Sequence, residues 1–275
     1  MIVDAHHHFW DPSRRDYPWM GDELAAIRKP FGPPELQPLL GAAGVDKTVL
    51  VQTVSSLSET REFLATATST DFVAGVVGWI DLTDPEIADA LADLRSGPGG
   101  NFLLGVRHQV HDEADPNWLL RDDVQRGIRS VGDAGLVYDL LVRTRELPAA
   151  IETARRNPDV RFVLDHMAKP RIAAGPRDAD WERAMAPLAG HQNVSCKLSG
   201  MVTEADWSNW TREDLKPYVA RALEWFGPKR CMFGSDWPVC LLASEYGHVV
   251  ATMREIVGDD DDVFGATASR VYRLA

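Results

Sequence analysis

Three of the first eight residues of the chain are histidines, and their spacing is suited to chemistry. They follow an apolar Ile-Val pair in the stretch MIVDAHHHFW. Successive side chains of an extended strand alternate between its two faces, so we expect Asp4, His6 and His8 on one face and Ala5 and His7 on the other. A neutral imidazole can bind a metal, accept a proton or polarise a carbonyl group. The stretch therefore predicts a strand that delivers His6 and His8 together into a reactive site.

Two simpler explanations of these histidines stand against that prediction. The remnant of a purification tag would be longer and would not grow out of an apolar strand. Ordinary core or surface histidines are common, but a spaced pair on one strand is less typical of a purely structural role. Further reactive groups elsewhere in the chain would favour a reactive site over either of these explanations.

The composition is that of a globular protein with an acidic surface. The 275 residues are 45% hydrophobic and 25% charged, and 41 acidic residues against 29 lysines and arginines give a formal net charge of −12. Such a surface is a poor partner for nucleic acid or an anionic membrane. No run approaches the ~18 apolar residues of a membrane span. The three cysteines lack the spacing of a disulfide framework or a zinc knuckle. We therefore expect a protein of the reducing cytoplasm. The sequence leaves the oligomeric state open.

Short apolar runs rich in β-branched residues alternate with helical patterns along the chain. This alternation favours parallel strands, because each parallel connection needs a crossover of a dozen or more residues. Eight such units in a chain near the ~250 residues typical of the fold predict one α/β domain over residues 1–275, a single (β/α)8 TIM barrel. A doubly wound sheet would instead have a glycine-rich turn after its first strand. The expected strands are residues 2–8, 47–53, 72–80, 102–108, 136–141, 160–166, 193–198 and 230–236, and the expected helices are 58–70, 85–94, 118–133, 148–157, 181–188, 211–226 and 246–257.

The barrel prediction directs attention to the carboxyl ends of the strands, where this fold carries its chemistry. Reactive side chains are concentrated at these positions. Besides His6 and His8 they are Arg107, His108, Asp165, His166, Lys197 and Asp236. The loop of residues 11–34 carries Tyr17 and Trp19, and it is expected either to cover the mouth as a lid or aromatic wall or to pack against the barrel helices.

Six blocks of sequence, in order, resemble the amidohydrolase superfamily and, more narrowly, its amidohydrolase-2 branch. They are D-A-H-x-H-F-W at the first strand, G-V-R at the fourth, L-D-H-x-x-K-P at the sixth, C-K-L-S-G at the seventh, F-G-S-D-W-P at the eighth and F-G-A-T-A-x-R-V-Y near the end. That branch holds sugar-acid lactonases, such as L-fuconolactonase and L-rhamnonolactonase, and 2-pyrone-4,6-dicarboxylate lactonase. The resemblance implies a catalytic site of His6, His8, His166 and Asp236.

The sequence departs from the two-metal members of the superfamily. Those members use a lysine or glutamate at the fourth strand and a further histidine at the fifth, where this chain has Arg107-His108 and Tyr138-Asp139. A single Zn²⁺ on His6, His8, His166 and Asp236 would still satisfy the usual nitrogen and oxygen ligands. Because the resembled family also includes lactonases that work without metal, we expect that no metal is required.

These observations predict a lactone hydrolase, with a sugar-acid lactone such as L-fuconolactone or L-rhamnonolactone as substrate. Asp236 would take a proton from water while His6, His8 and His166 polarise the carbonyl group. The remaining groups expected to contact substrate are Arg107, His108, Lys197, Trp10 and Trp19.

Three alternatives remain open from the sequence. A dicarboxylate lactone is favoured if Arg107, Arg143, Lys169, Arg171 and Lys197 cluster at the mouth, because bidentate arginines suit carboxylates. A zinc-dependent decarboxylase or amidase of the same superfamily is the second. The third is a non-catalytic sugar-acid binding protein, which would need no base at Asp236.

Overall fold

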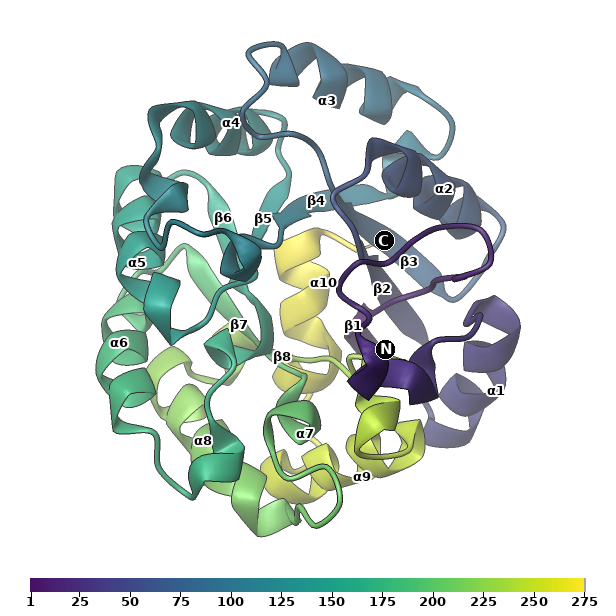
Figure 1. The fold of residues 1–275 in the computed structure, drawn as a ribbon, viewed down its shortest axis with the longest axis vertical. Helices are drawn as coiled ribbons and strands as arrows, with labels where there is room; N and C mark the ends of the chain where they lie inside the picture. Colours follow the sequence, from purple (N-terminus) through teal and green to yellow (C-terminus); the bar gives the residue numbers. More distant parts are fainter. Residues whose placement is uncertain (275) are drawn as a thin grey trace.

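Eight parallel strands form a barrel in the computed structural model, which describes residues 1–274. The strands pair in sequence order from β1 to β8, each parallel to the next (Figure 1). The expected (β/α)8 fold is therefore confirmed, with strands somewhat shorter than expected. Their bounds are β1 Val3–His7, β2 Lys47–Val51, β3 Val73–Gly78, β4 Leu103–His108, β5 Val137–Leu140, β6 Arg161–Leu164, β7 Val194–Leu198 and β8 Cys231–Phe233.

The ring closes between the first and last strands at the point where both end. A parallel bridge joins His7 to Trp237, and the Trp237 carbonyl accepts from the His8 amide at 2.7 Å. The Asp236 amide donates to the His6 carbonyl at 2.8 Å. The backbone hydrogen bonds that close the barrel thus also fix residues 6–8 against residue 236.

Helices surround the strands on the outside of the ring (Figure 1). Each expected helix is present within a few residues, and three further helices, α1, α7 and α10, lie outside the expected ranges. The proline-rich sequence of α1 concealed it, although Pro33 stands at the first helical position, where a missing amide hydrogen costs nothing. The bounds are α1 Pro33–Ala43, α2 Leu57–Thr68, α3 Ile87–Ser96, α4 Asp122–Asp133, α5 Leu147–Arg156, α6 Ala179–Ala189, α7 Met201–Glu204, α8 Arg212–Phe226, α9 Tyr246–Val257 and α10 Thr267–Tyr272.

The last helix lies at the centre of the ring in the view of Figure 1. Ala268 and Tyr272 of α10 pack against the valines inside the barrel, such as Val49 and Val137. The turn before α10 lies against the N-terminus, where a Cβ on Gly265 would stand 2.1 Å from the Met1 carbonyl oxygen. This helix therefore fills the amino-terminal end of the barrel and leaves the carboxyl end for the site.

The expected alternation along the first strand is wrong for Asp4 and Ala5. The pairing of β1 with β2 shifts between Asp4 and His7, so three steps on β1 match two on β2. Asp4 consequently leaves the barrel interior and accepts from the Ser235 amide and the Tyr246 hydroxyl, while Ala5 packs inside with Val49. His7 points to Thr48 on the outer side. A bulge of this kind re-aims side chains, and here it leaves His6 and His8 directed inward.

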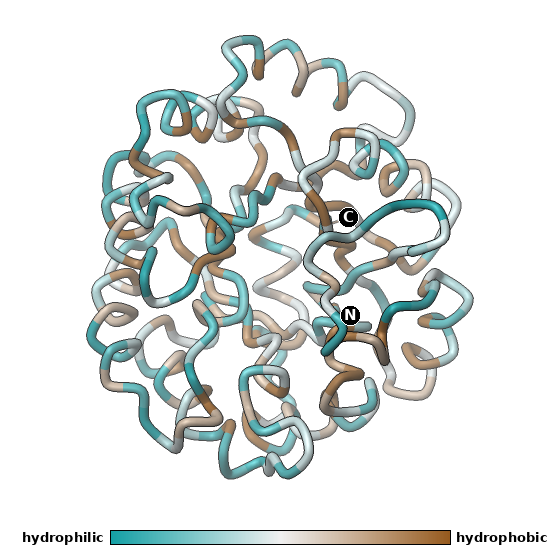
Figure 2. The backbone as a smooth tube through the Cα atoms, viewed as in Figure 1, coloured by the Kyte–Doolittle hydropathy of each residue, from teal (hydrophilic) through white to brown (hydrophobic). Residues whose placement is uncertain are grey.

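Hydrophobic and hydrophilic stretches alternate along the outer helices (Figure 2). In α4, for example, Val124, Ile128 and Val131 are buried against the barrel, while Asp122 is exposed to solvent. Within residues 1–274, no helix combines the length and the apolar character needed to cross a bilayer.

Candidate active site

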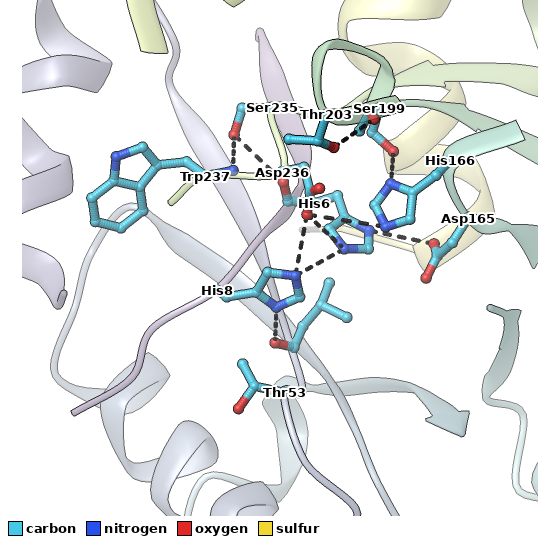
Figure 3. A network of polar contacts seen from close by, with 12 residues as sticks. His6, His8, Thr53, Asp165, His166, Ser199, Thr203, Ser235, Asp236 and Trp237 are labelled. Carbon is cyan, nitrogen blue, oxygen red and sulfur yellow. Dashed lines mark hydrogen bonds and ion pairs between the residues drawn. The ribbon is translucent and has the colours of Figure 1, made fainter. Parts of the chain in front are cut away.

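Asp236 and three imidazoles meet at the carboxyl end of the barrel. The Asp236 Oδ1 atom lies 3.3 Å from His8 Nε2, 3.7 Å from His6 Nε2 and 4.0 Å from His166 Nε2 (Figure 3). The Nε2 atoms of His6 and His8 are themselves 3.2 Å apart. We call these four residues the reactive centre. The structure therefore brings together all four residues expected to be catalytic.

The backbone at two of these residues adopts an uncommon conformation. Asp236 has a φ of 58°, and the four residues from His166 to Lys169 all have φ between 51° and 59°. Positive φ in residues with a side chain costs energy and is concentrated at functional sites. The left-handed turn from 166 to 169 directs His166 back over the barrel mouth. Gly200 makes room for it, because a Cβ there would lie 2.6 Å from the His166 ring.

Hydrogen bonds at the Nδ1 atoms orient the rings of His8 and His166. The His8 Nδ1 atom lies 2.7 Å from the Val51 carbonyl oxygen, which can only accept, so Nδ1 carries the proton and a neutral ring presents a lone pair at Nε2. The His166 Nδ1 atom is 2.9 Å from the Ser199 hydroxyl. Each ring is thus anchored on one side and faces Asp236 with the other.

Burial keeps two of the imidazoles neutral and their neighbours keep Asp236 ionised. Desolvation lowers the pKa of His166 to about 3, and it lowers the pKa of His6 well below its ordinary value. For Asp236 desolvation acts in the opposite direction, but the surrounding imidazoles outweigh it and hold the pKa of its carboxyl group below the ordinary value. At neutral pH the reactive centre therefore contains a carboxylate, which can accept a proton, beside rings that can act as hydrogen-bond partners.

A network of buried charges lies beneath the reactive centre; we call it the charged network. The Lys197 ammonium is 2.6 Å from Asp139 and 3.0 Å from Asp165, and Asp165 also lies 3.0 Å from Arg107. All four side chains are almost completely buried. The Asp165 oxygen that faces Lys197 also lies 3.3 Å from His6 Nδ1, which links the network to the reactive centre.

The two aspartates of the charged network differ in charge environment. Burial raises the pKa of both carboxyl groups, but Lys197, His6 and Arg107 together hold the pKa of Asp165 well below its ordinary value. Asp139 faces only one cation, so burial raises its pKa to about 6, and its other partner is the Tyr272 hydroxyl of α10. Asp165 is thus a fixed negative charge behind His6.

A cavity of about 390 Å³ opens above the reactive centre. Its floor includes His8, Arg107, His166 and Asp236. Aliphatic and aromatic side chains line one part of the wall: Trp19, Leu24, Leu141, Trp207, Val239 and Leu242. Polar and charged side chains line the rest: Thr53, Gln109, His111, Asp112, Arg143, Lys169, Thr203 and Glu204. The volume suits one small molecule with both polar and apolar faces.

The residues expected to contact substrate separate into two groups. Arg107 and Trp19 line the cavity, and Arg107 is held there by Gln52 and Asp165. His108, Lys197 and Trp10 are not among the lining residues. Lys197 belongs to the charged network instead.

The other two side chains outside the lining have protein partners. The ring of His108 stacks on Trp118 at 4.2 Å between centroids, and its nitrogens face Trp79 and Glu113. Trp10 donates to the Ile27 carbonyl and supports Trp19 edge to face at 5.4 Å. The loop of residues 11–34 thus contributes Trp19 and Leu24 to the cavity wall.

Sequence reasoning did not identify several residues of the cavity. His111, Asp112, Thr203, Glu204 and Trp207 all follow strand ends by several residues, in connections whose course the sequence pattern does not determine. Asp165 could be recognised as a candidate from the sequence, because it directly precedes His166 just after β6. Its role beneath His6 depends on Lys197 and Arg107, which come from other strands.

The donor atoms of the reactive centre fit a single metal ion. His6, His166 and Asp236 each offer one ligand atom within 4.8 Å of the others, and His8 Nε2 adjoins them. Two or three imidazoles with one carboxylate form a usual Zn²⁺ set. The Arg107 guanidinium lies 3.3 Å from His6 Nε2, so a cation is already present beside this set.

Comparisons with known proteins agree with this geometry. A family model described as amidohydrolase matches residues 3–274. An L-fucono-1,5-lactonase from Burkholderia ambifaria is 41% identical, covering 99% of this chain and 95% of that protein. Two crystal structures of an amidohydrolase from Burkholderia multivorans, each 36% identical over 100% of both chains, have TM-scores of 0.94 with bound HEPES and 0.93 with bound zinc.

Proposed function

Because this chain belongs to the amidohydrolase family, we propose that it is a lactonase that hydrolyses a sugar-acid lactone of the L-fucono-1,5-lactone type. The observation that carries the proposal is the ionised Asp236 carboxylate on the floor of the cavity. Its Oδ1 atom lies within 3.3–4.0 Å of three imidazole nitrogens. The similarity to an L-fucono-1,5-lactonase over nearly the whole chain supports the choice of substrate.

The chemistry assigns a role to each group. Asp236 takes a proton from a water molecule as that water attacks the lactone carbonyl carbon, and it returns the proton to the alkoxide that leaves when the ring opens. Arg107 and His166, which line the cavity, stabilise the negative charge that develops on the carbonyl oxygen. Arg107, His166 and Asp236 lie within three residues of the carboxyl ends of β4, β6 and β8, so their positions are fixed before the substrate arrives.

The charges of the cavity favour a neutral polyhydroxylated ring over a dicarboxylate. Three cations line the cavity, Arg107, Arg143 and Lys169, against the three carboxylates of Asp112, Glu204 and Asp236. The other two cations that might have favoured a dicarboxylate are engaged elsewhere, since Lys197 is in the charged network and Arg171 pairs with Asp178. The cavity lining therefore carries as many negative as positive charges, and it offers no excess of cations to bind two substrate carboxylates.

We expect the purified protein to release acid from L-fucono-1,5-lactone much faster than from the pyrone dicarboxylate lactone. A pH-indicator assay with both lactones, corrected for spontaneous hydrolysis, measures the ratio. Faster hydrolysis of the dicarboxylate would instead favour a pyrone lactonase. Binding of the sugar acid without turnover of either lactone would favour a sugar-acid binding protein.

We further propose that a metal is dispensable for this reaction, or present as at most one ion per chain. A single Zn²⁺ held by His6, His8, His166 and Asp236 would supply Lewis-acid polarisation of the carbonyl group. Arg107 already places a positive charge beside His6, anchored by hydrogen bonds of 2.8 and 3.0 Å to the Gln52 side-chain oxygen. This fixed cation can carry the same electrostatic role.

Removal of metal by a chelator is therefore expected to leave most of the lactonase activity. Elemental analysis of the same sample, before and after chelation, reports the number of ions per chain. Two tightly bound ions per chain would contradict the proposal. Loss of activity on chelation, with recovery when one equivalent of zinc is added, would show that the single ion is required.

A further inference from the structure

A lysine and a glutamate form an ion pair on the cavity wall that the chemistry described above does not use. The Lys169 ammonium lies 3.2 Å from the Glu204 carboxylate, and each side chain is 17% exposed. Both residues line the cavity. Their polar atoms are therefore partly shielded from solvent and still open to a bound molecule.

Both members of the pair are connected to the reactive centre by short, fixed segments. Lys169 ends the left-handed turn that begins with His166. Glu204 ends α7, which starts directly after Gly200, the residue packed against the His166 ring and Asp236. Four residues of helix span about 6 Å. The pair and Asp236 line the same cavity, so one small molecule can contact both.

An exposed tryptophan, three residues after Glu204, lines the same cavity as this pair. Trp207 is 37% exposed, and among residues 1–274 the only other large hydrophobic side chain exposed to this degree is Met1. Its indole nitrogen donates to the Thr203 carbonyl at 2.9 Å, so α7 fixes the orientation of the ring. Trp207 also lines the cavity. A rigid aromatic surface beside a charged pair presents an apolar face and strong hydrogen-bonding groups to the same ligand.

We propose that Lys169, Glu204 and Trp207 form a subsite for the ring hydroxyls of the sugar lactone. The Glu204 carboxylate accepts hydrogen bonds from hydroxyl groups, the Lys169 ammonium donates one, and Trp207 covers the apolar face of the ring. This inference rests on the proposed lactonase function and extends it, because it assigns the residues that select polyhydroxylated lactones over unsubstituted ones.

The physical reason for such selectivity is the cost of leaving the pair partly desolvated. A site built to hydrogen-bond a substrate hydroxyl rejects an analogue without that hydroxyl strongly, because its polar groups then lose water and gain no partner. The unsubstituted ring δ-valerolactone meets the same reactive centre but offers nothing to Glu204 or Lys169. A comparison of the two substrates therefore distinguishes recognition of the ring hydroxyls from catalysis at the carbonyl group.

The test compares wild type with Glu204→Gln on L-fucono-1,5-lactone and on δ-valerolactone. Glutamine keeps the size of the side chain and removes its charge. We expect kcat/KM for the sugar lactone to fall by on the order of 10- to 100-fold, the range typical for loss of a charged hydrogen bond, and kcat/KM for δ-valerolactone to stay within about threefold. The matched control Glu213→Gln, in a solvent-exposed pair with Arg212 on α8, should change neither value.

Binding of L-fucose, followed by calorimetry, separates failure of this inference from failure of the proposed function. If wild type hydrolyses neither lactone but binds L-fucose, and Glu204→Gln weakens that binding about tenfold or more, the subsite stands and the lactonase proposal falls. If Glu204→Gln lowers both kcat/KM values equally, or lowers neither, the pair is only structural and the subsite is refuted. An inactive wild type that binds no L-fucose refutes both.

Discussion

Asp236→Asn should lower kcat for sugar-lactone hydrolysis by on the order of 10²–10⁴-fold, because asparagine cannot accept the proton of the attacking water. The substitution is suited to this position. Asp236 has a φ of 58°, and asparagine tolerates the left-handed region better than other residues with a side chain. The backbone that closes the barrel should therefore be kept, and KM should change little.

A second carboxylate of the same cavity provides the control for that experiment. Asp112 also lines the cavity, but its nearest ionisable partner is His111, at 3.2 Å, and it has no contact with the reactive centre. Asp112→Asn should reduce kcat by less than about tenfold, the effect of one hydrogen bond at most. The proposed base is wrong if Asp236→Asn keeps activity within about threefold of wild type, well below the effect of a general base. It is also wrong if Asp112→Asn loses as much activity as Asp236→Asn.

The second large effect is expected on stability. Lys197→Met removes the cation that pairs with Asp139 and one of the two that pair with Asp165, and all these side chains are buried. Breaking a buried ion pair by removing one partner typically costs about 3–5 kcal/mol, because the remaining charge has lost its compensation. We expect a loss of this size in the free energy of unfolding, measured in urea by the fluorescence of the nine tryptophans.

Two further variants identify the origin of that loss. Lys216→Met removes an exposed lysine 4.0 Å from Glu213 and should cost less than about 1 kcal/mol. The double variant Lys197→Met/Asp139→Leu should regain part of the stability, because removing both partners is far less costly than removing one. An unchanged stability of Lys197→Met, or a double variant less stable than the single one, would show that the charged network does not act in this way.

The barrel and the residues of its reactive centre could be predicted from the sequence. Eight apolar runs separated by helical patterns admit few arrangements other than parallel strands joined by helices. The carboxyl ends of parallel strands all meet at one end of a barrel. His6, His166 and Asp236 lie within three residues of the carboxyl ends of β1, β6 and β8. They therefore had to approach one another, although 230 residues separate the first from the last in the printed sequence.

Which strand-end groups face the cavity, and which lie beneath it, could not be predicted from the sequence. Lys197 and Arg107 look alike in the sequence, as cations on strands, yet Lys197 is enclosed by Asp139 and Asp165, whereas Arg107 reaches the cavity floor. The bulge in β1 that turns Asp4 outward depends on the pairing with β2. Glu204 and Trp207 reach the wall only through the course of the connection after β7. Each of these outcomes depends on contacts between distant segments, which local periodicity does not contain.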